Sequence, residues 1–293
     1  MMGGVEFRQI DVFTARPFKG NPVAVVMDAS GLTDEQMQSI ASWTNLSETT
    51  FVLKPEDKNA DYRVRIFTPG SELPFAGHPT IGTAYALLEA GVIHPTDGKI
   101  VQECGAGLVS LSVSATGSKG TFISFELPEP RITLLTPEQV DQLDSILGCV
   151  IDRSLTPALV DVGARWIVAR TLDASRVLQT QPDYARLTEH DRNMGITGVC
   201  LYGEHRADNG MHIEVRSFAP ACGVNEDPVC GSGNGSVAAF LRHHSVTLPP
   251  GGAVKSSQGQ KLGREGEIGL TIGREKILVG GLAVTCIRGT IHY

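Results

Sequence analysis

Residues 226–241, EDPVCGSGNGSVAAFL, place a carboxylate, a thiol and a hydroxyl around the start of a predicted helix. These groups belong to Asp227, Cys230 and Ser232. A helix begins with unpaired backbone N–H groups and a partial positive charge, so its first turn attracts an anion. Gly231 lets the backbone approach a ligand closely. We interpret this segment as part of a binding site for a small anionic molecule.

The same plan occurs earlier in the chain. Residues 65–88, RIFTPGSELPFAGHPTIGTAYALL, and the later copy, RSFAPACGVNEDPVCGSGNGSVAAFL, both contain Arg-x-Phe-small-Pro, a loop, Pro-x-small-Gly-polar and a small-residue helix. In the earlier copy, Gly77 and His78 stand where the later copy has Gly231 and Ser232. Two such helix starts facing each other would form a cradle for an anionic group.

A lone carboxylate, Glu48, stands in NLSETTFV, where the pattern passes from a helix into an apolar strand. The corresponding residue in the other copy of the repeat is Gly198, so only one half of the chain carries this acid. A carboxylate enclosed by apolar walls has a raised pKa, which suits a proton shuttle. Glu48 is therefore the candidate acid-base group, with a solvated strand end as the alternative. For Asp227, two roles are open: a cap of the following turn, or an acceptor for a substrate ammonium or hydroxyl.

The elements that must position these groups are short strands and a few helices. Thr33, with Gln36 three residues on, predicts one helix start, and Thr136 followed by Pro137 predicts another. Alternating apolar residues predict strands with one buried face in VEFRQIDVF (5–13), DYRVRIF (61–67) and GLVSLSVS (107–114). The mixture indicates an α+β protein.

A repeat separated by about 150 residues is too long for a solenoid and predicts two similar domains related by a pseudo-two-fold axis. Two prolines flank a charged turn in LPEPRITLLTP, which marks the boundary between them. The predicted domains are residues 1–127 and 128–293. The last strand, about 281–293, is a candidate to pair back onto the first domain.

Composition restricts the class of protein. The chain of 293 residues has a formal net charge of −7 and no basic run, which argues against nucleic-acid binding. Its six cysteines include no Cys-x-x-Cys pair, so we expect no metal site. No signal peptide and no membrane-spanning run is visible in the sequence. We expect a cytoplasmic protein that binds a small molecule, not a membrane.

The motifs RPFKGNPVAVV, NLSETTFV, RIFTPGSELPFAGHPTIG and EDPVCGSGNG occur in the order found in PhzF-like proteins, and the chain resembles this family over nearly its full length. The resemblance implies the diaminopimelate-epimerase-like fold, with two pseudo-symmetric domains. Each would be a curled, mostly antiparallel sheet around a central helix, with the site in the cleft between them. The resemblance also implies a homodimer, no cofactor and a substrate with a carboxylate.

In the enzymes that the chain resembles, a glutamate of the Ser-Glu-Thr motif moves a proton between carbons of a dihydro-hydroxyanthranilate. By this resemblance the chain is an isomerase whose proton carrier is Glu48. The matched positions would hold the carboxylate, amino and hydroxyl groups of the substrate. The candidate catalytic residues are Glu48, Asp227 and His78, and the candidate substrate-binding residues are Gly77, Ser232, Gly231 and Cys230.

Cys230 leaves an alternative open. The related epimerases have a cysteine at each helix start, whereas this chain has Ala76 at the other start. An unequal pair of Glu48 and Cys230 would make an amino-acid epimerase or racemase, because a helix N-terminus lowers the pKa of a thiol. The other interpretation of Cys230 is a threonine-to-cysteine exchange with no catalytic role. A third reading is a metabolite-binding protein without turnover.

Overall fold

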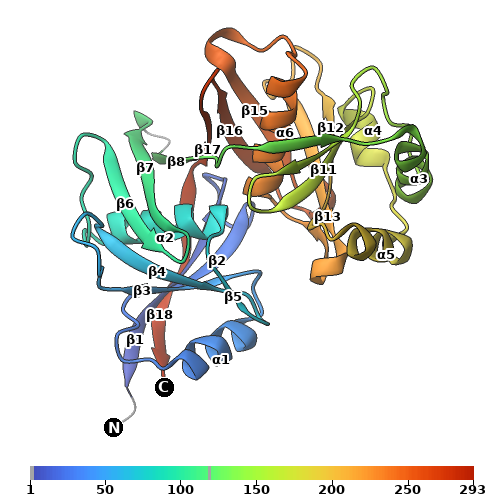
Figure 1. Cartoon of the computed structure of the whole chain (residues 1–293). Helices are drawn as coiled ribbons and strands as arrows, with labels where there is room; N and C mark the ends of the chain where they lie inside the picture. Colours follow the sequence, from blue (N-terminus) through green and yellow to red (C-terminus); the bar gives the residue numbers. More distant parts are fainter. Residues whose placement is uncertain (1–2, 118–119) are drawn as a thin grey trace. The chain divides into compact units, whose positions relative to one another are not determined.

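The computed structural model describes residues 3–117 and 120–293, and these residues form two compact units. The first unit contains the described residues up to Phe125 together with Gly280–Tyr293, and the second contains Glu126–Val279. Figure 1 shows strands and helices mixed in both units. The predicted α+β class is therefore confirmed.

The first unit has a mixed sheet whose strands follow the order β18, β1, β2, β3, β4, β6, β7, β8. The pairs β2–β3 and β4–β6 are parallel, and the other pairs are antiparallel. The two-residue strand β5 also pairs with β4. The bounds are β1 Gly4–Val12, β2 Asn21–Val26, β3 Thr49–Leu53, β4 Tyr62–Phe67, β5 Glu72–Leu73, β6 Lys99–Cys104, β7 Gly107–Ala115, β8 Thr121–Glu126 and β18 Ala283–His292.

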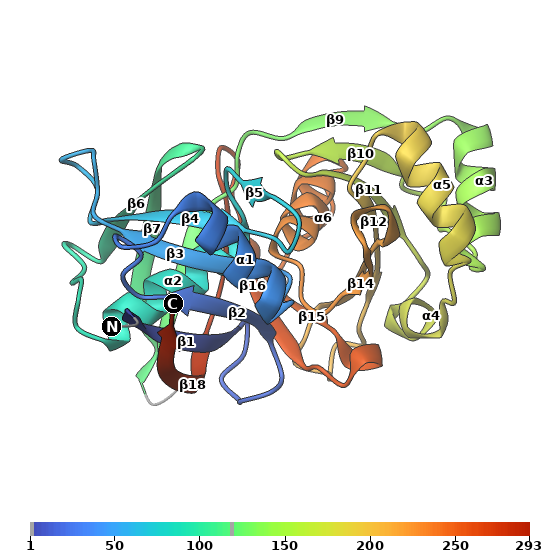
Figure 2. The ribbon, with the colours of Figure 1, turned by 90° about the horizontal axis from the view of Figure 1, so that it is seen from below.

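Two helices pack on this sheet. Helix α2 (Gly77–Glu89) contacts β1, β2, β3 and β18, and helix α1 (Asp34–Thr44) contacts β3 and β4. Gly82 allows the close approach of α2, because a Cβ at this position would overlap the side chain of Val23. Strand β18 lies beside β1 in both ribbon views (Figures 1 and 2). The last strand of the chain therefore completes the sheet on which α2 packs.

The second unit repeats this order with β9, β10, β11, β12, β13, β15 and β16, of which β11–β12 and β13–β15 are parallel. A turn joins β16 to β17, in which the Gly273 N–H donates to the Lys276 carbonyl. The bounds are β9 Arg131–Leu134, β10 Ala158–Asp161, β11 Arg165–Arg170, β12 Gly198–Glu204, β13 Ile213–Ala219, β14 Val224–Asp227, β15 Ala253–Gln258, β16 Gly266–Ile272 and β17 Ile277–Gly281.

Helix α6 (Gly231–His243) contacts β10, β11, β12 and β16 and takes the place that α2 has in the first unit. A separate apolar cluster joins other helices to the sheet through side chains that include Leu143, Leu187, Ile167 and Phe218. The remaining helices are α3 Pro137–Leu147, α4 Ala174–Gln179, α5 Tyr184–Met194 and the short 3-10 helices η2 Pro220–Cys222, η3 Pro250–Gly252 and η4 Gln260–Leu262.

Local sequence signals explain several element ends. Thr33 and Thr136 each cap a helix through a reciprocal pair of hydrogen bonds with the glutamine three residues on, as predicted. Pro137 occupies the first turn of α3, where its missing N–H costs nothing. The predicted strands at 5–13, 61–67 and 107–114 are confirmed as β1, β4 and β7, with ends that differ by one residue.

The repeat extends to side-chain contacts. In β4, the guanidinium carbon of Arg65 lies 5.1 Å from the ring centre of Phe67, and in β13 that of Arg216 lies 4.8 Å from the ring centre of Phe218. Such cation–π contacts favour one orientation of the arginine. The two Arg-x-Phe strands therefore have the same local structure, and each leads through a loop to the central helix of its unit.

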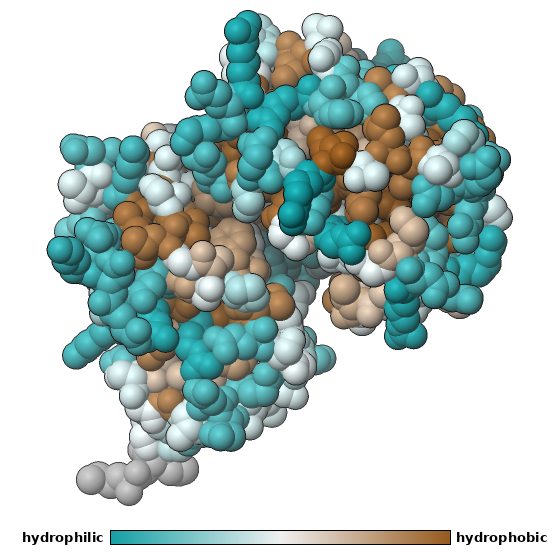
Figure 3. Space-filling view, viewed as in Figure 1, coloured by the Kyte–Doolittle hydropathy of each residue, from teal (hydrophilic) through white to brown (hydrophobic). Residues whose placement is uncertain are grey.

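Hydrophilic residues cover the outward side of helix α1 in Figure 3, whereas its Met37 and Ala41 are buried against the sheet. Throughout the described residues, every helix is too short or too polar to cross a membrane.

Candidate active site

The predicted site residues divide between the two units, and each group gathers at the start of the central helix. The first unit contains Glu48, Gly77 and His78, and the second contains Asp227, Cys230, Gly231 and Ser232.

In the first unit, the structure brings Glu48 and His78 together. Glu48 directly precedes β3, and its backbone carbonyl accepts a hydrogen bond from Ala24 at 3.4 Å. His78 is the second residue of α2. The Glu48 Oε2 and the His78 Nε2 are 3.2 Å apart, and the side chains are only 16% and 7% exposed. This acid and imidazole therefore form a close, largely enclosed pair.

The imidazole of this pair is uncharged at neutral pH. Burial lowers the pKa of His78 to about 3, against an opposing hydrogen bond with the Pro22 backbone. The His78 Nδ1 also lies 3.4 Å from the Asn21 Nδ2. A neutral imidazole has one donor and one acceptor nitrogen. The His78 Nε2 makes no hydrogen bond to any described residue in this geometry, so its 3.2 Å approach to Glu48 is a close contact of a neutral imidazole with the acid.

The start of α2 also presents backbone donors. Its N-cap residue, Ala76, has an extended backbone and makes no side-chain cap hydrogen bond. Pro79 has no N–H, and within the described residues the amides of Gly77 and His78 meet no acceptor. Two unpaired N–H groups at a helix start are suited to an anion.

In the second unit, a hydrogen-bond network fixes the loop before α6. The Cys230 Sγ accepts from the Gly233 N–H at 3.3 Å and thereby caps the helix. The Cys230 N–H and the Asn234 side chain donate to the Gln258 Oε1 at 3.1 and 2.7 Å. The Gln258 amide donates in turn to the Asp227 carbonyl at 2.9 Å. Gln258 and Asn234 are thus positioning residues that the sequence did not single out.

The Asp227 carboxylate has both a local partner and an unusual pKa. Its Oδ1 accepts from the Val229 N–H at 3.0 Å, so it does cap the turn. Burial raises the pKa of Asp227 to about 6, although the Val229 N–H and the Cys230 thiol stabilise the charged form. The residue is therefore also poised to exchange a proton near neutral pH.

The thiol of Cys230 is not activated. Burial raises its pKa well above the usual value, and the negative charge of Asp227 adds to this shift. The expectation that the helix start lowers this pKa is wrong, because loss of hydration outweighs the partial charge of the helix. Cys230 is a protonated thiol at neutral pH.

Ser232 is held by a residue that the sequence analysis missed. The indole Nε1 of Trp166, on β11, donates to the Ser232 Oγ at 3.0 Å. The Cys230 Sγ lies 3.5 Å from the same oxygen. Over the described ranges, the amides of Gly231 and Ser232 have no acceptor, as at the start of α2.

The second unit has no counterpart of Glu48. Glu48 directly precedes the residue paired with Phe67, and Gly198 directly precedes the residue paired with Phe218, so the two positions correspond. A Cβ at Gly198 would overlap the carbonyl oxygen of Phe218. No side chain fits at this position, and the asymmetry in acid-base groups is fixed by the backbone.

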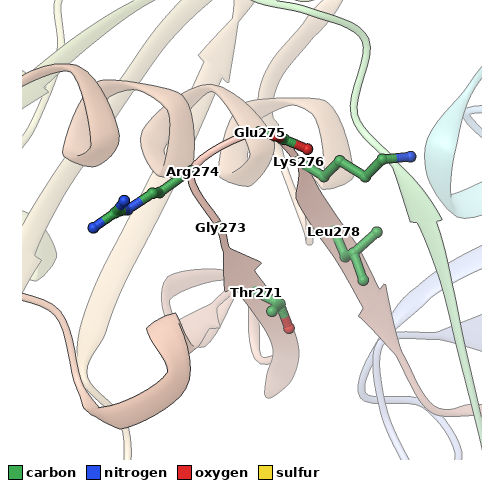
Figure 4. A pocket seen from close by; sticks show the side chains of 6 residues that line it. All are labelled: Thr271, Gly273, Arg274, Glu275, Lys276 and Leu278. Atoms are coloured by element: carbon green, nitrogen blue, oxygen red, sulfur yellow. The ribbon is translucent and has the colours of Figure 1, made fainter.

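The described residues around the two helix starts form neither a metal centre nor the pocket at the β16–β17 turn. Within residues 3–117 and 120–293, no group of three His, Cys, Asp or Glu side chains could hold a metal ion. A pocket of about 430 Å³ lies at the β16–β17 turn. Figure 4 shows that Arg274, on its rim, points away from Lys276 and Leu278. None of the predicted site residues lines it.

The family model for phenazine biosynthesis-like proteins, PhzC-PhzF, matches residues 10–289. The chain belongs to this family. A similar PhzF-family protein of known structure, from Bacillus anthracis, has a TM-score of 0.88 at 26% identity, with 99% of each chain covered. The predicted family and its epimerase-like fold are thereby confirmed.

Two curated relatives are similar to the chain over nearly its full length. The chain is 43% identical to antisense-enhancing sequence 1 of Schizosaccharomyces pombe, with 97% of each chain covered. It is 34% identical to a trans-2,3-dihydro-3-hydroxyanthranilate isomerase of Pseudomonas chlororaphis, over 96% of this chain and 97% of the relative. Like the isomerases that it matches, this PhzF-family protein is an isomerase.

Proposed function

We propose that this PhzF-family isomerase moves a single proton on a small amino or hydroxy acid that carries a carboxylate, with Glu48 as base and then as acid. The observation that carries the proposal is the 3.2 Å contact between the Glu48 Oε2 and the His78 Nε2. The matching position in the other unit is Gly198, so of the two repeat positions one alone carries an acid.

The proton transfer proceeds in two balanced steps. The Glu48 carboxylate takes a proton from a substrate carbon next to an electron-withdrawing group, so a C–H bond breaks, an O–H bond forms and the electron pair delocalises in the substrate. The new carboxylic acid then returns the proton to a different carbon. His78 stays uncharged and lies 3.2 Å from the Glu48 carboxylate throughout. Substrate and product have the same composition, so electrons balance without an oxidant.

The remaining groups suit the other parts of such a substrate. The amides of Gly77 and His78, and those of Gly231 and Ser232, are donors for oxygen atoms that carry negative charge. The Asp227 carboxylate accepts from an ammonium or hydroxyl group. The isomerase from Pseudomonas chlororaphis is named for a substrate with amino, hydroxyl and carboxylate groups. We propose that this isomerase acts on a molecule of this class.

The epimerase alternative is less well supported. It needs a second base on the opposite face of the reacting carbon, and the base that the sequence suggests for this role is the thiol of Cys230. Burial keeps that thiol protonated, and its sulfur accepts from the Gly233 N–H. The other helix start has Ala76 at the corresponding position.

The proposal is tested by product formation from trans-2,3-dihydro-3-hydroxyanthranilate and related cyclic amino-hydroxy acids. Glu48→Gln keeps the size of the side chain but removes the base, so the rate should fall by about 100-fold or more. Glu35→Gln, an exposed change on α1, is the matched control and should keep the wild-type rate. Substantial turnover by Glu48→Gln would exclude Glu48 as the proton carrier.

A further inference from the structure

Among the described residues, Trp166 is the one large aromatic side chain whose polar group contacts a predicted substrate-binding residue. It lies on β11 and is only 2% exposed, and its Nε1 is 3.0 Å from the Ser232 Oγ. Ser232 itself is partly exposed at the start of α6. An indole N–H can only donate a hydrogen bond, so the direction of this contact is fixed.

The neighbours of Ser232 determine where its own proton can go. A serine hydroxyl has one O–H and two lone pairs, and the indole occupies one lone pair. The Cys230 sulfur, at 3.5 Å, already accepts from the Gly233 N–H, and the Cys230 thiol is hydrogen-bonded to the Asp227 carboxylate. In this structure the Ser232 hydroxyl donates to the Cys230 sulfur over 3.5 Å, which is a weak hydrogen bond. A substrate carboxylate is a stronger acceptor and would take this proton instead.

The described part of the first unit has no equivalent of this arrangement. Trp166 pairs with Gly198 across the parallel strands, and the corresponding residue of β2 is Val23, which cannot donate. The residue of α2 at the Ser232 position is His78. The indole-to-hydroxyl contact therefore belongs to the α6 start alone.

We propose that Trp166 is a positioning residue that holds the Ser232 hydroxyl as a hydrogen-bond donor to the carboxylate of the substrate. This inference rests on the proposed function and adds a specificity element to it. The donated O–H and the unpaired amides of Gly231 and Ser232 form a set of donors for one anionic group. An amide or ester in place of the carboxylate would accept weaker hydrogen bonds from these donors, because it carries no negative charge.

The first experiment observes the contact without turnover. The chain has two tryptophans, so its ¹H–¹⁵N spectrum has two indole N–H signals, and Trp43→Phe identifies the one from Trp166. Ser232→Ala should move the Trp166 signal upfield by removing its acceptor, whereas Ser232→Thr should leave it nearly in place. Adding trans-2-aminocyclohexanecarboxylate should shift this signal in the wild type and not in Ser232→Ala. The proposal would be overturned if the Trp166 indole signal had the same chemical shift in Ser232→Ala as in the wild type. It would also be overturned if adding the probe left the wild-type Trp166 signal unshifted.

The second experiment tests whether Trp166 acts through Ser232. Trp166→Phe removes the donor but keeps an aromatic ring, and it should raise KM about 3- to 10-fold, the value of one hydrogen bond, with kcat little changed. In the Ser232→Ala background the same change should raise KM by less than about twofold, because the two effects are not additive. Equal effects in both backgrounds would mean that Trp166 supports only the packing of β11 and would overturn the proposal.

The two proposals fail in different ways. If the wild type shows no isomerisation but the Trp166 signal responds to the probe and to Ser232→Ala, the proposed function fails and the role of Trp166 stands. If Glu48→Gln abolishes turnover but the indole signal is insensitive to Ser232→Ala, the proposed function stands and the role of Trp166 fails.

Discussion

The starts of α2 and α6 have the same backbone but different chemistry. Each helix has 13 residues, begins with a glycine and leaves two N–H groups unpaired within the described residues. The α2 start adds an acid and a neutral imidazole, Glu48 and His78. The α6 start adds Asp227, a protonated thiol and the Trp166–Ser232 contact. A duplicated scaffold thus leaves helix-start amides unpaired twice, and the proposed function gives one half the base and the other half the binding groups.

The Arg-x-Phe strands show a similar contrast in their ion pairs. Arg65 pairs with Glu72 at 2.7 Å with side chains 19% and 42% exposed, whereas Arg216 pairs with Glu226 at 2.7 Å with both side chains 5% exposed. Arg216 also donates to two backbone carbonyls of the segment at residues 177–180. Equivalent residues therefore differ in energetic importance, because burial removes the water that would replace a lost partner.

The largest predicted effect follows from this difference. Arg216→Ala should lower the free energy of unfolding by about 3–5 kcal/mol, because it leaves the buried Glu226 carboxylate without its partner. Arg65→Ala should cost about 1 kcal/mol or less, since water reaches its partners. Urea denaturation of both variants beside the wild type measures the difference. Equal losses of unfolding free energy would show that the two ion pairs contribute equally to stability.

A smaller effect is predicted at the position that matches Glu48. Gly198→Ala should lower the free energy of unfolding by about 1–3 kcal/mol, because the added Cβ overlaps the Phe218 carbonyl and the strands must separate. Gly70→Ala is the control, since a Cβ there meets nothing within 4 Å. Thermal denaturation compares the two. A Gly198→Ala variant as stable as the wild type would remove the backbone reason for the asymmetry.

The two halves should respond to pH in opposite directions. His78 has its pKa lowered to about 3, so its contribution to stability is full above pH 6.5 and is lost as the pH falls towards 3. Asp227 has its pKa raised from 3.8 to about 6, so its contribution is full below pH 3.8 and is lost as the pH rises through 6. For each group, the unfolding free energy changes by at most about 1.4 kcal/mol per pH unit.

Unfolding free energies of the wild type, His78→Gln and Asp227→Asn from pH 4 to 8 measure these slopes. Relative to the wild type, His78→Gln should gain stability as the pH falls below 6.5, because the replaced imidazole no longer resists protonation. Asp227→Asn should gain stability as the pH rises from 4 to 6, because no carboxylate is ionised in a buried site. Parallel curves for a variant and the wild type would show that the replaced group has an ordinary pKa.

Local signals in the sequence predicted a large part of the fold. The capping threonines and Pro137 act within one helical turn, so the starts of α1 and α3 were predictable from neighbouring residues. The repeat supplied the correspondence between Glu48 and Gly198, which the strand register reproduces. Short-range and repeated patterns therefore sufficed for the elements and for the residues at both helix starts.

Contacts between distant residues were not predictable in this way. Trp166 lies 66 positions from Ser232, and Gln258 lies 28 positions from Cys230, and each stands in an ordinary strand sequence. The pKa of Cys230 was predicted in the wrong direction because the helix start is visible in sequence, whereas burial beside Asp227 depends on packing. The catalytic role of Glu48 stays a prediction, supported by its contact with His78.

Deuterium exchange tests most directly the claim that one half carries the proton and the other half only binds. In D₂O, with trans-2,3-dihydro-3-hydroxyanthranilate as the substrate, the wild type and Cys230→Ser should both place solvent deuterium on carbon, and Glu48→Gln should place none. Deuterium incorporation that persists in Glu48→Gln, or that disappears in Cys230→Ser, would contradict the account.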